Sequence, residues 1–207
     1  MGDASTARRT LGRQERGKET RRKLIRAATR LWSERGFDAV TVEELCAEAG
    51  VGRTTFYLHF ESKERLLASL AGATAAGVVL DLEHVRDSES LDAQLGAFIR
   101  GVARRMDDVP TSLVQLVIQS QRAGAMNATP EQLAESTSFA DILREILAAA
   151  RRRGELSRAA NAAELGDILG ALTMDAIETW ASRHSGETSL ATVLRRRFAV
   201  VLDQYRA

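Results

Sequence analysis

VGRTTFYLHF, residues 51–60, places two Phe, one Tyr and one His within ten positions of a chain that is only 5% aromatic. At about 100° per residue, Phe56 and Phe60 fall on one face of a short helix. The arc outside that face carries a guanidinium, a hydroxyl, a phenol and an aliphatic group, from Arg53, Thr54, Tyr57 and Leu58. The stretch therefore predicts an amphipathic helix with two aromatic anchors and a mixed outer surface.

The residues before this stretch predict two further helices. Apolar side chains recur at helical spacing from Leu24 to Trp32, and Gly36 ends that helix. Thr41-Val-Glu-Glu44 is a capping box that begins a second helix, which Gly50 ends. A short helix, a tight turn through residues 51–52 and another short helix are typical of a helix-turn-helix motif.

The outer arc of the third helix and the charge of the N-terminus both point to nucleic acid. Guanidinium, hydroxyl, phenol and methyl groups can reach guanine edges, thymine methyls and phosphates in a major groove. Residues 1–30 carry ten Lys or Arg against three Asp or Glu, 10 − 3 = +7, whereas the whole chain sums to +1. A basic N-terminal arm favours a polyanionic partner, with a solubilising tail as the alternative.

Residues 18–70 resemble the DNA-binding domain of the TetR family, the tetracycline-repressor-like transcriptional regulators. The resemblance rests on LIRAATRLWSERGFDAVTVEELCAEAGVGRTTFYLHFESKERLL, residues 24–67. It includes the Ala-Ala-x-x-Leu-Trp run, the Thr-Val cap, Ala-Gly-Val at the turn, Phe-Tyr-x-His-Phe and Ser-Lys-Glu-x-Leu-Leu. These motifs cover about a quarter of the chain and occur in the family's order.

The resemblance implies a role for each matching position. Base-reading positions would be Arg53, Thr54 and Tyr57. Phosphate-contacting positions would be Thr41, Thr55, His59 and Lys63. Two residues depart from the family's usual pattern: Gly52 stands where Ser or Thr usually caps the recognition helix, and Thr54 stands where Gly, Ala or Pro is frequent.

The remainder of the chain also predicts helices. We expect an all-α fold of about nine helices, with an N-terminal three-helix helix-turn-helix DNA-binding domain and a C-terminal helical ligand-binding and dimerisation domain. The expected organisation is a flexible basic arm at 1–16, the helix-turn-helix domain at 17–63 and the ligand-binding and dimerisation domain at 64–207. Thr129-Pro-Glu and Asn161-Ala-Ala-Glu164 are helix-start signals, and Gly154 is a stop signal.

The last two helices, about Ala162–Ser182 and Thr188–Tyr205, are the expected homodimer interface, because both look too apolar for the surface of a small domain. Small residues Gly166 and Gly170 would allow close approach. The alternative is that these faces complete the core of one subunit. The predicted interface residues are Leu165, Ile168, Leu169, Leu172, Ile177, Leu194, Phe198, Val201 and Leu202.

The family resemblance also implies an internal pocket for a small-molecule effector. The candidate lining residues are Phe98, Met106, Gln115, Gln119, Met126, Phe139 and Met174. Apolar side chains with a few amides would suit a mostly apolar ligand with one or two hydrogen bonds. Each Met or aromatic residue is also a core candidate.

Other classes of protein find little support. The single cysteine, Cys46, excludes an internal disulfide, and no apolar leader opens the chain. The longest uncharged stretch, Leu66–Leu80, is short of a membrane span and is expected to be a buried helix. No nucleophile motif, phosphate loop or dinucleotide fingerprint occurs, so neither an enzyme nor a cofactor is expected. Asp81 and His84 at i, i+3 are weak evidence for a metal site.

The sequence therefore predicts a cytoplasmic, ligand-responsive transcriptional regulator. A homodimer would bind a palindromic double-stranded DNA operator, most simply as a repressor that a small-molecule effector releases. The alternatives are a ligand-independent DNA-binding activator or architectural protein, and a helical enzyme that retains the helix-turn-helix domain.

Overall fold

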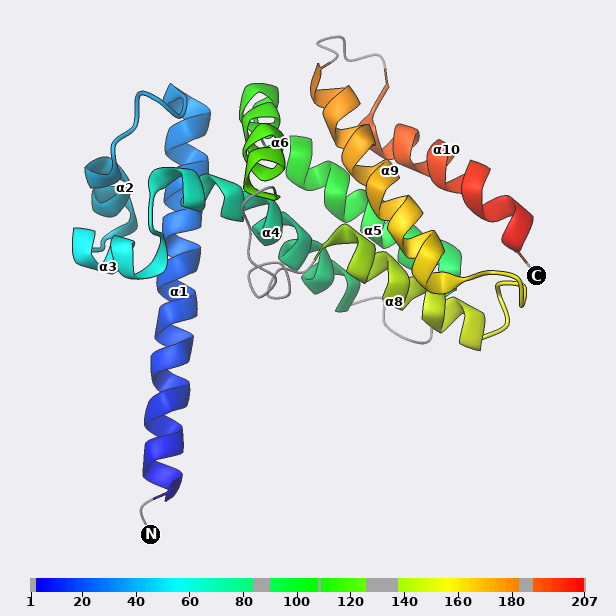
Figure 1. Ribbon diagram of the computed structural model, residues 1–207, viewed down its shortest axis with the longest axis horizontal. Helices are drawn as coiled ribbons and strands as arrows, with labels where there is room; N and C mark the ends of the chain where they lie inside the picture. Colours follow the sequence, from blue (N-terminus) through cyan, green and yellow to red (C-terminus); the bar gives the residue numbers. More distant parts are fainter. Residues whose placement is uncertain (1–2, 84–89, 108, 126–137, 183–187, 207) are drawn as a thin grey trace. The chain divides into compact units, whose positions relative to one another are not determined.

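The computed structural model describes residues 3–83, 90–107, 109–125, 138–182 and 188–206. Within these ranges the chain forms nine α-helices and no β-strand, which confirms the expected all-α fold (Figure 1). The helices divide into two compact units, Met1–Leu70 and Ala71–Ala207. The second unit thus begins at residue 71, whereas the sequence suggested residue 64.

Three helices and the start of a fourth form the first unit. They are α1 (Asp3–Arg35), α2 (Val42–Ala49), α3 (Arg53–His59) and α4 (Lys63–Leu82), the last of which continues into the second unit. The second unit adds α5 (Leu91–Asp107), α6 (Thr111–Ala125), α8 (Phe139–Arg152), α9 (Ala162–Ser182), α10 (Leu190–Leu202) and a 3-10 turn, Asp203–Tyr205.

Local sequence signals set most helix ends. Gly36, Gly50 and Gly154 each follow a helix with a positive φ, of 82°, 66° and 80°, as their stop signals predicted. The side-chain oxygen of Asn161 accepts from the amide of Ala163 at 3.2 Å and so caps α9. The start signal at Thr129 lies outside the described residues.

The N-terminus differs from the expected flexible arm at 1–16, because α1 begins at Asp3. No proline interrupts residues 3–35, and Ala, Arg, Gln, Glu and Lys are all good helix formers. Surface ion pairs support the turn around residue 18: Lys18 Nζ lies 3.0 Å from Glu15, and Arg26 lies 3.1 Å from Glu19. Gly12 and Gly17 weaken this helix without ending it.

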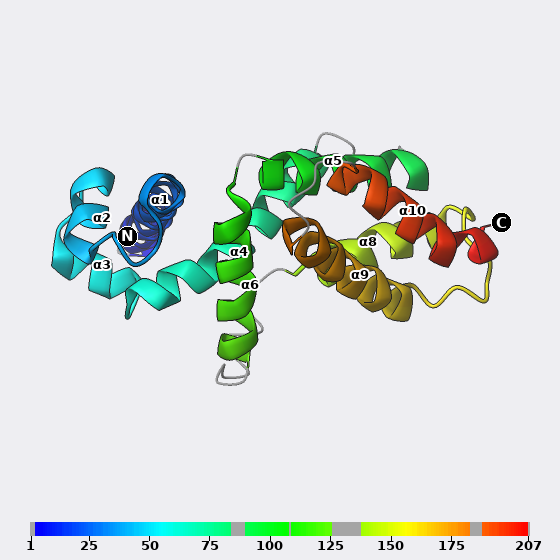
Figure 2. The same ribbon diagram turned by 90° about the horizontal axis from the view of Figure 1, so that it is seen from above.

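In the first unit, α2 and α3 pack on one side of α1, as Figures 1 and 2 both show. The apolar stripe of α1 supplies Leu24, Ala28, Leu31 and Trp32, all buried. Val40, Leu45 and Phe56 complete the core from the other elements. Cys46 is buried beside Leu45, and burial raises the pKa of its thiol, as expected for an inert core cysteine.

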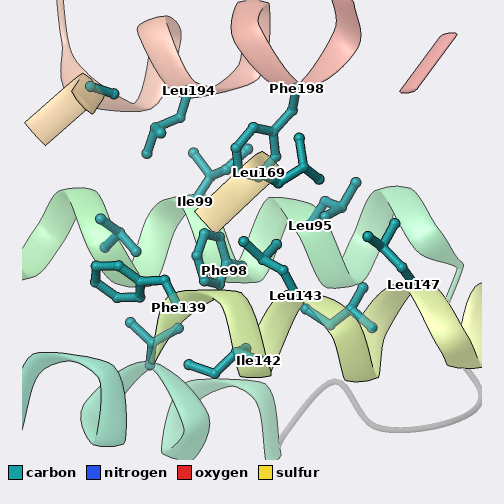
Figure 3. Close-up of a cluster of buried hydrophobic side chains, with 14 of the residues drawn as sticks. Leu95, Phe98, Ile99, Phe139, Ile142, Leu143, Leu147, Leu169, Leu194 and Phe198 are labelled. Atoms are coloured by element: carbon teal, nitrogen blue, oxygen red, sulfur yellow. The ribbon is translucent and has the colours of Figure 1, made fainter. Parts of the chain in front are cut away.

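The core of the second unit is an aromatic cluster inside a layer of aliphatic side chains. Phe98 of α5 is fully buried and meets Phe139 of α8 edge-on at 5.7 Å between ring centroids. The Phe98 ring also stacks on the ring of Phe198 of α10, with 6.1 Å between the ring centroids. Figure 3 shows these three rings surrounded by leucine and isoleucine side chains from α5, α8, α9 and α10.

Six of the nine residues predicted at a dimer interface belong to this core. Leu165, Leu169, Ile177, Leu194, Phe198 and Leu202 are each less than 5% exposed within the single chain. Their apolar faces pack against α5, α8 and each other, so they complete the subunit core and cannot form its outer surface. Of the remaining three, Ile168 is exposed, while Leu172 and Val201 are partly buried.

The glycines of α9 likewise serve a contact inside the subunit. A Cβ on Gly170 would lie 2.7 Å from Ala140 Cβ, and one on Gly166 would lie 2.8 Å from the backbone nitrogen of Arg144. Real Cβ contacts are not this short, so α8 and α9 approach closely because both positions lack a side chain. The sequence predicted close approach at these positions but assigned it to a second subunit.

One described helix, α4, has the length and hydropathy of a membrane span. The core helix of a soluble protein meets the same criteria, so α4 by itself is weak evidence for a membrane. Its buried side chains include Leu66 and Leu67 in the first unit and Ala75 and Val78 in the second.

Candidate nucleic-acid interface

The helix-turn-helix is formed by α2, a two-residue turn and α3. Gly50 adopts the left-handed conformation and donates its amide to the carbonyl of Ala47 at 3.2 Å, which ends α2. The Val51 amide donates to Cys46 O at 3.0 Å, and Gly52 begins α3 from an extended conformation. Gly52 has no side chain to cap α3, so the first turn of α3 presents backbone N–H groups without a capping hydroxyl.

Two phenylalanines fix α3 on its domain. Phe56 is fully buried and Phe60 is 3% exposed, with their ring centroids 6.1 Å apart. The guanidinium of Arg21 lies 4.7 Å over the Phe60 ring, which joins the end of α3 to α1. The prediction that these two rings belong to the core is confirmed, and they define the inward direction of α3.

The outward face of α3 carries the three predicted base-reading residues. Arg53 and Thr54 are exposed, and Tyr57 is 48% exposed with its ring edge-on to Phe56 at 5.3 Å. Thr55 and His59 are partly exposed on the flanks of this face. The imidazole of His59 lies close to α1 at Gly17, where an added Cβ would be 3.7 Å from His59 Cε1.

An ion pair orients Arg53. Its Nη1 lies 2.7 Å from Glu43 of α2, and both side chains are more than half exposed. The pair joins the two helices of the motif and leaves the other guanidinium nitrogens free of Glu43. Sequence reasoning missed this contact, because ten residues separate the partners and no helical period relates them across a turn.

Thr41 is the N-cap of α2 and forms hydrogen bonds with Glu44. Its hydroxyl accepts from the Glu44 amide at 3.2 Å and donates to Glu44 Oε2 at 2.9 Å, while its own amide donates to Oε2 at 2.8 Å. The backbone hydrogen bond from Thr41 and the Arg35 side chain lower the pKa of Glu44 to about 2. Glu44 is therefore a carboxylate at neutral pH, and the capping box predicted from the sequence is confirmed.

Each acidic residue of α2 has an arginine partner. Glu43 pairs with Arg53, Glu44 with Arg35 at 2.7 Å, and Glu48 with Arg30. Isolated carboxylates beside a DNA-binding helix would repel phosphate, and the paired arginines offset this repulsion. The whole first unit, residues 1–70, carries 14 Lys or Arg and 10 Asp or Glu, 14 − 10 = +4.

Lys63 has an intramolecular role that the sequence did not reveal. Its Nζ donates to the carbonyls of Phe37 at 2.9 Å and Val40 at 3.0 Å, both in the loop between α1 and α2. The ammonium also lies 4.2 Å over the ring of Phe37. An ammonium has three N–H donors, so these contacts leave one for a phosphate.

The predicted effector-pocket residues are scattered among several environments. Phe98, Met106 and Phe139 are buried in the core of the second unit. Gln115 donates its side-chain amide to Ala181 O at 3.0 Å, which ties α6 to α9, while Gln119 is exposed and Met174 is partly buried. Met126 lies outside the described residues.

The described residues contain no cluster of three His, Cys, Asp or Glu side chains that could hold a metal ion. Asp81, considered above as half of a metal pair, instead accepts from Arg104 at 2.7 Å and from Arg105. The Arg105 hydrogen bond holds the pKa of Asp81 below its ordinary value. The other half of that pair, His84, lies outside the described residues.

The fold and this surface define a helix-turn-helix protein, and comparisons with known proteins show which proteins it resembles. Residues 24–70 match the family described as bacterial regulatory proteins, tetR family. The chain is 30% identical over 107 residues to the transcriptional regulator YerO of Bacillus subtilis, across 48% of this chain and 37% of YerO. It is 26% identical to the transcriptional repressor BepR of Brucella suis, across 81% of this chain and 83% of BepR.

A solved structure shares the fold over most of the chain. FadR of Thermus thermophilus, a TetR family transcriptional repressor in complex with lauroyl-CoA, superposes with a TM-score of 0.64 at 23% identity, over 87% of this chain and 92% of FadR. Residues 24–70 therefore form a helix-turn-helix domain of the tetR type, and the fold of the chain is similar to that of FadR. YerO and BepR are named as transcriptional regulators and not as enzymes. The alignment with YerO spans well under two thirds of that relative's length.

Proposed function

We propose that this chain is a ligand-responsive transcriptional repressor that binds a palindromic DNA operator as a homodimer in the cytoplasm. The observation that carries the DNA-binding part is the outward face of α3. Arg53, Thr54 and Tyr57 project from a helix that two buried phenylalanines hold in place. A rigid helix with exposed donors and a basic flank suits the major groove, where base edges are read.

Replacement of Arg53 by alanine is expected to relax sequence preference. A duplex selected from a random pool by the full chain would bind the Arg53→Ala variant about 5- to 150-fold more weakly, the 1–3 kcal/mol of one arginine–guanine contact. Binding to random duplex would fall much less. Both affinities are measured by fluorescence anisotropy at one fixed salt concentration.

Arg65→Ala is the matched control, because Arg65 is an exposed arginine on α4 that pairs with Glu61. It removes the same charge outside α3 and should leave the ratio of specific to random binding unchanged. Equal selectivity of Arg53→Ala and the parent chain would refute the base-reading role of Arg53. A parent chain that selects no sequence would favour the architectural alternative.

A homodimer is supported by the exposed apolar residues that α9 and α10 leave uncovered. These helices run antiparallel (Figure 1), and Arg197 joins them by donating to Leu172 O at 3.1 Å and to Asp175. Val200 lies about one turn beyond Arg197 on α10, and Ile168 lies about one turn before Leu172 on α9. Because the two helices are antiparallel, Val200 and Ile168 lie at about the same height along the pair. Val200 is 77% exposed and Ile168 is 41% exposed.

Charging this surface is expected to separate the subunits. In a Val200→Asp, Ile168→Asp double variant, like charges would meet across the interface, and sedimentation should show a monomer at concentrations where the parent chain is dimeric. Both positions are exposed, so the melting temperature of each isolated subunit should change little. Dimers that persist in the variant would contradict this choice of interface. Two subunits would present their recognition helices to half-sites about 34 Å apart.

An apolar small-molecule effector is supported by the character of the second unit and by one relative. The FadR structure contains lauroyl-CoA. In this chain the second unit is built around an aromatic and aliphatic core between α5, α8, α9 and α10. An effector that binds this unit would release DNA through α4, since α4 begins in the first unit and ends in the second. Linkage then requires that saturating operator weaken effector binding by the same factor.

A further inference from the structure

Leu58 is the most exposed large hydrophobic side chain in the described part of the protein. Five such residues are exposed, and two of them, Leu58 at 78% and Tyr57 at 48%, are neighbours on the seven-residue helix α3. Single exposed leucines are ordinary on protein surfaces. Two adjacent exposed large hydrophobic residues, Tyr57 and Leu58, on so short an element indicate a contact surface.

Leu58 occupies the centre of the outward face of α3. It lies two residues from each of the buried anchors Phe56 and Phe60, which is about 160° from both at 100° per residue. Thr54 precedes Leu58 by one helical turn and is also exposed, so the two share this face. An α3 that enters a major groove with its anchors behind it points Leu58 toward the base pairs.

The surroundings of Leu58 suit DNA better than an apolar protein partner. Its face of α3 is rimmed by the Arg53 guanidinium and by the hydroxyls of Thr54 and Thr55, and the first unit has a net charge of +4, from 14 − 10. A stable interface with a protein partner would require a wider apolar area than the single helical turn that carries Leu58. The positive charge favours a polyanion.

A hydrocarbon side chain can recognise only one feature of a major groove. Each base edge offers hydrogen-bond donors or acceptors, which leucine cannot satisfy, except that thymine also presents its C5-methyl group. We propose that Leu58 is a specificity-determining residue that packs against a thymine methyl in each half-site. This inference rests on the proposed function, since it requires that α3 bind duplex DNA.

Removal of the methyl group alone tests the contact. The full-length chain is used to select a duplex from a random pool, and each thymine of that duplex is then replaced singly by uracil, which lacks only the C5-methyl. For the parent chain, replacing one particular thymine of each half-site by uracil should weaken binding roughly three- to five-fold, which is the contribution of one buried methyl group. Leu58→Ala should bind the thymine and uracil duplexes equally at that position.

A second exposed leucine gives the matched control. Leu80→Ala makes the same substitution at a 56% exposed position on α4 and should retain the parent's penalty at every thymine. The melting temperature of Leu58→Ala should lie within about 1 °C of the parent's, because a side chain that is 78% exposed makes few contacts in the folded protein. If the variant keeps the same uracil penalties as the parent, the inference is overturned while DNA binding stands. If the parent selects no sequence, the proposed function fails first.

Discussion

Replacing Gly170 with alanine is expected to lower the free energy of unfolding of the second unit by about 2 kcal/mol. The new Cβ would meet Ala140 of α8 at 2.7 Å from its Cβ and 2.9 Å from its Cα, and neither atom can rotate away. The two helices must separate, which exposes core surface and loosens packing, at a typical cost of about 1–3 kcal/mol. In a chain of this length the melting temperature should fall by roughly 4–8 °C.

Gly166→Ala should behave in the same way, since its Cβ would meet the backbone of Arg144 at 2.8 and 2.9 Å. Gly72→Ala is the matched control: Gly72 lies inside α4 with nothing within 4 Å of an added Cβ. That substitution should raise stability by about 0.5–1 kcal/mol through helix propensity alone. A gain in stability for Gly170→Ala, equal to that for Gly72→Ala, would contradict the close α8–α9 packing.

The glycines of α9 show where reasoning from sequence reaches its limit. Helical periodicity identified the face of α9 on which Gly166 and Gly170 lie and the closeness that they permit. It carries no information on which helix fills that face, because contacts between helices depend on the path of the whole chain. The same ambiguity affected Leu165, Leu194 and Phe198, whose apolar faces complete the subunit core.

Local chemistry was far more predictable than tertiary contacts. The capping box of Thr41 and Glu44 and the left-handed glycines at positions 36 and 50 depend on interactions within four residues, and the structure has each of them. The division of α3 into buried Phe56 and Phe60 and an exposed polar arc follows from one helical period. These features together fix the motif that presents the candidate DNA contacts.

Several of the missed contacts are ion pairs or hydrogen bonds between residues on different helices. Arg53 meets Glu43 across the turn of the motif, and Gln115 reaches the carbonyl of Ala181 over 66 residues. Neither partner can be chosen in advance from residue type, since many carboxylates and carbonyls compete for each donor. A different cause extends α1 to Asp3. Residues 1–16 lack an apolar stripe and were therefore predicted to be flexible, yet the Ala, Arg, Gln and Glu residues among them favour helix.

Lys63→Met is expected to destabilise the first unit by about 3 kcal/mol and thereby weaken DNA binding. The ammonium forms two hydrogen bonds to loop carbonyls, Phe37 O and Val40 O, and lies over the Phe37 ring. Charged hydrogen bonds of this kind contribute about 1.5–3 kcal/mol each, less where solvent competes, and methionine leaves both carbonyls unsatisfied. The loop that they anchor leads directly into the N-cap of α2 at Thr41.

Two readouts separate this anchoring role from a phosphate contact. Trp32 is buried in the first unit, so its fluorescence in a Trp180→Phe background reports unfolding of that unit alone. The anchoring role predicts that the first unit of Lys63→Met unfolds at a lower denaturant concentration than that of the parent. It also predicts an unchanged slope of log affinity against log salt concentration. A pure phosphate contact predicts unchanged unfolding and a slope smaller by about 1. Lys23→Met, at an exposed position on α1, controls for loss of charge without loss of the loop contacts.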